Sequence, residues 1–120
     1  MRAFIGGSRS IIDPAALEAG IALSTWTITE IITGTSRGTD ALVIAWAERA
    51  KIPYTAIPAD WTRFGGRAEL VRSEMVLPMV EGCLLLWDGY STGTATMMAS
   101  ARKRGIPVVV HRVNPQPISR

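Results

Sequence analysis

Three short polar stretches carry the residues of this chain that are best suited to bind an anion. They are GGSRS at 6–10, GTSRGTD at 34–40 and DGYSTGTAT at 88–96. Glycine lets the backbone approach a ligand closely, and the hydroxyl side chains donate hydrogen bonds. The first two stretches also carry an arginine, whose flat guanidinium pairs well with phosphate or carboxylate. The chemistry that these residues suggest is the binding of a phosphate or a similar group.

The first two stretches repeat the pattern G-x-S-R, which begins at Gly6 and again at Gly34. The spacing corresponds to one strand plus one helix. Where such a turn leads into a helix, free backbone N–H groups and the helix dipole also favour negative charge. Neither the dinucleotide-binding pattern G-x-G-x-x-G nor the P-loop pattern is present. The repeat favours an anionic or nucleotide-like ligand over plain turns, without identifying that ligand.

Strand-like and helix-like segments alternate around these stretches. Strands are predicted at 2–7, 28–33, 54–59, 83–88 and 106–113, and helices at 14–24, 40–52, 67–80 and 94–105. Asp13 is the expected N-cap of the first helix, and Pro78 marks the end of the third helix or a kink in it. This alternation predicts a mainly parallel five-stranded sheet with helices on both faces. Ligands of such sheets bind beyond the carboxyl ends of the strands, where all three polar stretches fall.

The composition is that of a small globular protein. The 120 residues, 48% of them hydrophobic, fit one domain at 1–113 followed by a loose tail at 114–120. A single cysteine, Cys83, excludes a disulfide framework and favours a cytoplasmic protein, in which it would be a buried core residue. The chain shows no signal peptide and no apolar run long enough for a membrane span. One histidine and one cysteine make no ordinary zinc site, so no metal and no cofactor is expected.

The formal net charge of +3 fits an anionic ligand and is small for a nucleic-acid-binding protein. Eleven of the 13 basic residues are arginine. The charged fraction, 19%, is low, which indicates burial against a second subunit. Met97 and Met98 are adjacent on a predicted helix, so burying both requires packing on two sides. We therefore expect a homodimer or larger assembly that uses helix 94–105 or helix 67–80.

In combination, GGSRS, GTSRGTD, PADWTRFGG and DGYSTGT resemble the YspA-like branch of the SLOG superfamily over about residues 3–112. The DprA and LOG families are related to it. The resemblance implies a Rossmann-like, doubly wound fold and the binding of a nucleotide or a nucleotide-derived signal. The residues that it places at the ligand, together with those of the three stretches, are Gly6, Gly7, Ser8, Arg9, Gly34, Thr35, Ser36, Arg37, Gly38, Asp40, Asp60, Trp61, Arg72, Asp88, Ser91, Thr92, Gly93 and Thr94.

Two of these residues have two interpretations each. Trp61 could stack on a base or ribose, or could form a hydrophobic lid over the sheet edge. Asp40 could bind a ribose hydroxyl or cap the helix that follows, and its residue type favours capping.

The sequence departs from LOG-type hydrolases at the third stretch. Those enzymes carry a catalytic glutamate within three residues of their glycine-rich turn, whereas here STGT is followed by Ala95, Thr96 and Met97. Cleavage of an N-glycosidic bond needs such a carboxylate, and Glu69 and Glu74 lie on another predicted helix. The sequence therefore predicts a protein that binds its ligand, to sense or sequester it, without transforming it. A LOG-type phosphoribohydrolase and a DprA-like binder of single-stranded nucleic acid are the alternatives.

Overall fold

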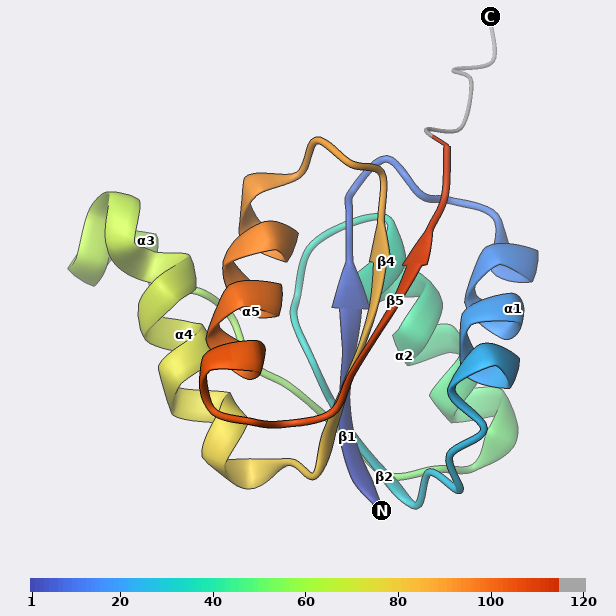
Figure 1. The fold of residues 1–120 in the computed structure, drawn as a ribbon. Coiled ribbons are helices and arrows are strands. Elements are labelled where there is room, and N and C mark those ends of the chain that lie inside the picture. Colours follow the sequence, from blue (N-terminus) through green and yellow to red (C-terminus); the bar gives the residue numbers. More distant parts are fainter. Residues whose placement is uncertain (115–120) are drawn as a thin grey trace, which may run out of the picture.

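The computed structural model describes residues 1–114, which contain one fully parallel sheet with helices on both faces (Figure 1). The strands are β1 (Arg2–Gly7), β2 (Glu30–Thr33), β3 (Tyr54–Ala56), β4 (Gly82–Trp87) and β5 (Val108–Arg112). Their order across the sheet is β3-β2-β1-β4-β5, and each neighbouring pair is parallel. The predicted Rossmann-like fold with a five-stranded parallel sheet is confirmed. Of the predicted tail, residues 115–120 lie outside the described part of the chain.

The helices lie in two groups, one on each face of the sheet (Figure 1). Helices α1 (Pro14–Ser24) and α2 (Thr39–Ala50) cover one face, and α4 (Ala68–Val76) and α5 (Thr92–Lys103) cover the other. The short helix α3 (Trp61–Phe64) and the 3-10 turns η1 (Gly65–Arg67) and η2 (Leu77–Met79) flank α4. As predicted, Asp13 caps α1, because its side chain accepts a hydrogen bond from Ala15 N at 3.0 Å.

Alternation along the strands divides the core into two clusters. Ile5 and Leu84 belong to the cluster under α1 and α2, whereas Phe4 and Leu85 belong to the cluster under α4 and α5. Successive side chains of a strand point to opposite faces of the sheet, so both faces of β1 and β4 are buried. Cys83 lies within this core as expected, and burial raises the pKa of its thiol to about 12.

The segment between β3 and α4 differs from the prediction. The strand predicted over 54–59 ends at Ala56, and a helix that the sequence pattern did not indicate begins at Trp61. Asp60 is the N-cap of this helix, since its Oδ1 atom accepts a hydrogen bond from Arg63 N at 3.0 Å. The predicted helix 67–80 is α4 continued by η2, which contains Pro78.

The packing of Met97 and Met98 corrects the argument for a second subunit. Both side chains are buried within the described chain, in the same cluster as Val76 and Leu77. Helix α4 and turn η2 thus pack against the side of α5 that we had expected a second subunit to cover. No helix within residues 1–114 combines the length and apolar character that crossing a membrane requires.

Candidate functional site

The three polar stretches meet at the carboxyl edge of the sheet, where they follow β1, β2 and β4 (Figure 1). The chain builds β2 and β3 on one side of β1 and then crosses to β4 on its other side, so the strand order switches between β1 and β4. Open parallel sheets bind ligands at such a switch point. Residues from all three stretches line one cleft of about 1240 Å³ there, and a chamber of about 510 Å³ adjoins it. The predicted convergence of the three turns is confirmed.

Ser8 holds the three turns together from behind the cleft. Its backbone N–H donates to Leu86 O at 2.9 Å, and its Oγ accepts from Asp88 N at 3.0 Å. Its carbonyl oxygen accepts a further bond from Thr39 Oγ1 at 2.9 Å. Ser8 is fully buried and lines neither the cleft nor the chamber. Its position is therefore that of a structural link between the turns.

The glycines of the turns leave room for other protein atoms. A β-carbon at Gly7 would collide with the Leu86 carbonyl oxygen, and one at Gly38 would collide with the backbone of Arg9. Gly38 also has a φ of +75°, which L side chains rarely adopt. Gly7 is therefore required for its close contact with strand β4, and Gly38 for the close packing of the second turn on the first. Close approach to a ligand stays a prediction for Gly7, which lines the cleft.

Asp40 lies beneath the first two turns and does not cap α2. Gly38 occupies the N-cap position, and Asp40 Oδ2 accepts a hydrogen bond from Ser36 N at 3.1 Å. The favoured interpretation of Asp40 as a helix cap is thus wrong. Burial raises the pKa of this carboxyl group, and the Ser36 N–H and the Arg72 guanidinium oppose the shift only in part. Asp40 still lines the cleft.

Asp88 joins the first and third stretches. Its Oδ2 atom accepts a hydrogen bond from Ser10 Oγ at 2.7 Å, and its Oδ1 atom accepts from Tyr90 N at 2.7 Å and Ser91 N at 2.8 Å. Burial acts to raise the pKa of Asp88, but these hydrogen bonds outweigh it and lower the pKa below the ordinary value. Because both of its oxygens already accept hydrogen bonds, the main role of Asp88 is to hold the first and third stretches together.

Three arginines from three different segments face the same space. Arg9, Arg37 and Arg72 each line both the cleft and the adjoining chamber. Among residues 1–114, no carboxylate oxygen lies within 4.0 Å of their guanidinium nitrogens. The Nε atom of Arg72 is also buried without an acceptor in the described chain. None of the three is therefore held in a close ion pair, and Arg72 and Arg9 lie near enough to Asp40 to favour its charged form.

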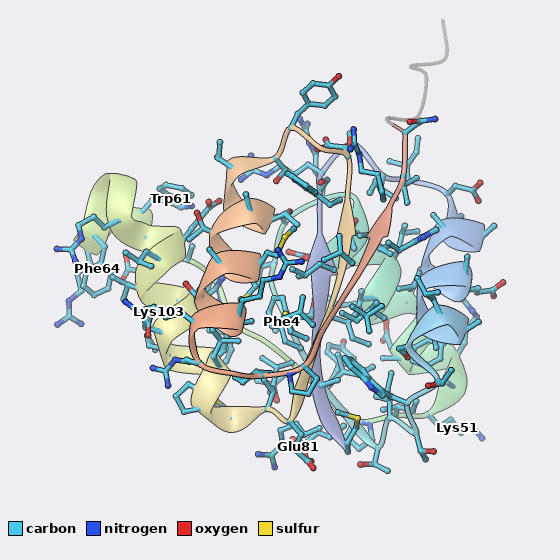
Figure 2. The ribbon with its side chains drawn as sticks, in the orientation of Figure 1. Phe4, Lys51, Trp61, Phe64, Glu81 and Lys103 are labelled. Atoms are coloured by element: carbon cyan, nitrogen blue, oxygen red, sulfur yellow. The ribbon has the colours of Figure 1, made fainter. Side chains whose placement is uncertain are left out.

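Large side chains stand at the rim of the cleft. Trp61, Tyr90 and Ile12 line it and are exposed by 50%, 76% and 61%. Figure 2 shows the Trp61 ring on the side of α3 that faces α5, whereas Phe64 lies on the outer side. Stacking on a ligand and covering the sheet edge are both compatible with this position of Trp61.

The predicted site residues divide into two groups. Those that line the cleft or the chamber are Gly7, Arg9, Thr35, Ser36, Arg37, Asp40, Trp61, Arg72, Asp88, Ser91, Thr92, Gly93 and Thr94. Those that line neither are Gly6, Ser8, Gly34, Gly38 and Asp60. The members of the second group support the turns or begin α3, as described above for Ser8, Gly38 and Asp60.

Glu69 is the charged cleft residue that the prediction missed. It lines both the cleft and the chamber, and a β-carbon at Gly93 would collide with both oxygens of its carboxylate. As predicted, Glu69 lies on a different helix from the third turn, but we did not predict that this helix brings its carboxylate against Gly93. Its position three residues before Arg72 was the available signal, since residues at i and i+3 share one side of a helix. The remaining unpredicted lining residues are Phe4, Ser10, Ile12, Ala59, Leu85, Tyr90 and Met97.

The fold is that of the Rossmann-like domains, and the cleft lies at the point where the strand order switches. The model of the YspA, cpYpsA-related SLOG family matches residues 1–64, and the chain belongs to that family. It is 34% identical over 85 residues to the gene 61 protein of Mycobacterium phage D29, an alignment that covers 66% of this chain and 68% of that protein. No solved structure is significantly similar to the chain. Membership of the family points to the binding or processing of nucleotide-related molecules.

Proposed function

We propose that the protein binds a small nucleotide or nucleotide-derived anion in the cleft, and that it senses or sequesters this ligand without transforming it. The observation that carries the proposal is the convergence of Arg9, Arg37 and Arg72, none of which has a carboxylate partner in the described chain. The three guanidinium groups gather around one chamber and repel one another, although the carboxylates of Asp40 and Glu69 lie near them. A bound anion would relieve that repulsion.

The shape and lining of the cleft support a ligand of nucleotide size. Binding sites for small molecules are typically about 300–1,000 Å³ and mostly apolar, with a few polar groups that fix orientation. Here Phe4, Leu85 and Met97 line the cleft together with the arginines and the hydroxyl groups of the third stretch. Trp61 and Tyr90 offer rings on which a base could stack.

The test is a thermal-shift screen of nucleotides and cyclic nucleotides, followed by mass spectrometry of small molecules released when the purified protein is denatured. A ligand at 100 times its Kd raises the unfolding free energy by about 2.7 kcal/mol, which a thermal shift detects readily. We expect binding to wild type and to Arg49→Ala, whose arginine is exposed on α2, and loss of binding in Arg72→Ala. Equal binding by all three proteins, or by none of them, would contradict the proposal.

One observation favours a second candidate, a hydrolase of nucleotides. The Glu69 carboxylate lies against Gly93, so a carboxylate is present beside the third turn although none follows STGT in the sequence. Such a group could stabilise positive charge at the anomeric carbon or activate water. Release of free base or ribose phosphate from a bound nucleotide, abolished in Glu69→Gln, would establish this activity and overturn the proposal of binding alone.

A further inference from the structure

A carboxylate from helix α4, that of Glu69, lies against the third turn. Helix α5 begins there, and the first turn of the helix contains Thr92, Gly93 and Thr94. Ser91 Oγ already accepts a hydrogen bond from Thr94 N at 3.3 Å, and the Glu69 carboxylate packs on Gly93. The helix start that the sequence predicted to face a phosphate therefore faces a carboxylate.

A phosphate at that position would be repelled by Glu69. Two like charges in contact repel one another strongly at the surface of a protein. A hydroxyl group would instead donate a hydrogen bond to the same carboxylate, and the two neighbouring hydroxyls of a ribose could both do so. Glu69 thus favours a sugar over a phosphate beside Gly93.

Positive charge is concentrated elsewhere in the site. The adjoining chamber is lined by Arg9, Arg37 and Arg72 and by the hydroxyl groups of Thr35 and Ser36. The part of the cleft that lies outside this chamber contains Asp40 and Asp88 and no arginine. The arginines therefore gather in the chamber, and Glu69 lines both parts of the site. Asp40 lies in the cleft, close enough to Arg72 and Arg9 to be influenced by their charge.

We propose, on the basis of the proposed function, that the ligand binds with its phosphate in the arginine-lined chamber and with its sugar hydroxyls against Glu69. Glu69 then determines specificity by excluding a second phosphate from the start of α5. The ligand class that fits is a nucleoside monophosphate or another molecule with its phosphate at one end only. A molecule whose polyphosphate extends toward α5 is rejected.

Ribose 5-phosphate and pyrophosphate test this assignment without assuming a base. NMR titration of each compound against wild type, Glu69→Gln and Glu18→Gln gives the ratio of the two affinities for every protein. Glu18 is exposed on α1, so Glu18→Gln removes one negative charge far from the cleft. We expect wild type and Glu18→Gln to prefer ribose 5-phosphate. In Glu69→Gln the ratio should shift toward pyrophosphate by about tenfold or more.

The possible results separate the inference from the proposed function. If all three proteins bound both compounds with the same ratio of affinities, the role of Glu69 would be rejected and the anion site would still be supported. A wild-type preference for pyrophosphate would reject that role as well. If neither compound bound any of the three proteins, the anion site itself would be rejected, and the inference with it.

Discussion

At the scale of single residues, the predicted affinity of the site resides in its guanidinium groups. Arg9 and Arg37 are exposed, line the cleft and have no carboxylate partner in the described chain. Replacing either with alanine should weaken binding of the nucleotide identified by the screen by about 1.5–3 kcal/mol, which is typical of hydrogen bonds to charged groups. Isothermal titration calorimetry measures the change, and circular dichroism checks that the fold is intact. Unchanged affinity in both variants would identify them as ordinary surface arginines.

A second residue-scale prediction concerns Asp88 and stability. The folded protein lowers the pKa of Asp88 below the ordinary value of 3.8. The charged form therefore stabilises the fold above about pH 4, and this contribution is lost as the pH falls through the lower pKa of the folded state. Asp88→Asn should reduce the unfolding free energy at pH 7 by about 1.5–3 kcal/mol, the scale of hydrogen bonds to a charged group.

Urea unfolding at several pH values measures this difference. It should narrow steadily as the pH is lowered from 4 toward 2, because wild type then loses the same charge. Glu18→Gln, which changes an exposed carboxylate on α1, should show no comparable loss at pH 7. If the difference in unfolding free energy between wild type and Asp88→Asn did not depend on pH, the charge of Asp88 would not contribute to stability.

At the scale of elements, the site depends on how closely the turns before α1 and α2 pack. Gly38 has a φ of +75°, and a β-carbon there would collide with the backbone of Arg9. Gly38→Ala should therefore lower the unfolding free energy by about 2 kcal/mol or more, since it combines backbone strain with a steric clash. Gly66→Ala is the matched control, because Gly66 is exposed and a β-carbon there meets nothing within 4 Å.

Denaturant unfolding compares these two variants, and the nucleotide screen is then repeated on both. We expect Gly38→Ala to lose affinity as well as stability, because the shift it forces moves Arg9 relative to Arg37. Equal stability of the two variants would show that the first two turns can separate without cost.

At the scale of the whole molecule, we propose that residues 1–113 form a single domain that self-associates. Because Met97 and Met98 are buried, helix α5 no longer indicates a contact with a second subunit. The other predicted contact helix, 67–80, keeps exposed apolar side chains. Leu70 and Met75 on α4 and Met79 on η2 are exposed by 39%, 59% and 41%. Exposed apolar groups gathered on one segment are typical of contact surfaces.

Sedimentation velocity tests the association. Wild type should sediment as a dimer or larger assembly at micromolar concentration, and Met75→Glu should shift it toward the 13.0 kDa monomer by placing a charge in the contact. The matched control is Leu23→Glu, which places the same charge at an exposed apolar position on α1. A monomeric wild type would contradict the proposal.

Local patterns in the sequence were enough to predict the class of fold and the edge of the sheet that carries the candidate site. Apolar strand runs such as CLLLW and the helix start at Asp13-Pro14 are local patterns, so they can be recognised without tertiary information. Once the strands are parallel, the turns after β1, β2 and β4 must lie at one edge. This is why the convergence of GGSRS, GTSRGTD and DGYSTGT was predictable. Helix α3 was missed because four residues are too few to show a helical period.

Which side chains of those turns face the cleft could not be predicted in the same way, because it depends on contacts made on folding. Ser8 turns inward to bond Leu86 and Asp88, which lie about eighty residues further along the chain, and no local pattern indicates such a partner. Glu69 reaches Gly93 only because α4 packs beside α5, and the same packing buries Met97 and Met98. Side-chain direction and charge balance depend on contacts between distant segments. The sequence could therefore place the site, but the contacts made on folding determine which of its residues present charge to a ligand.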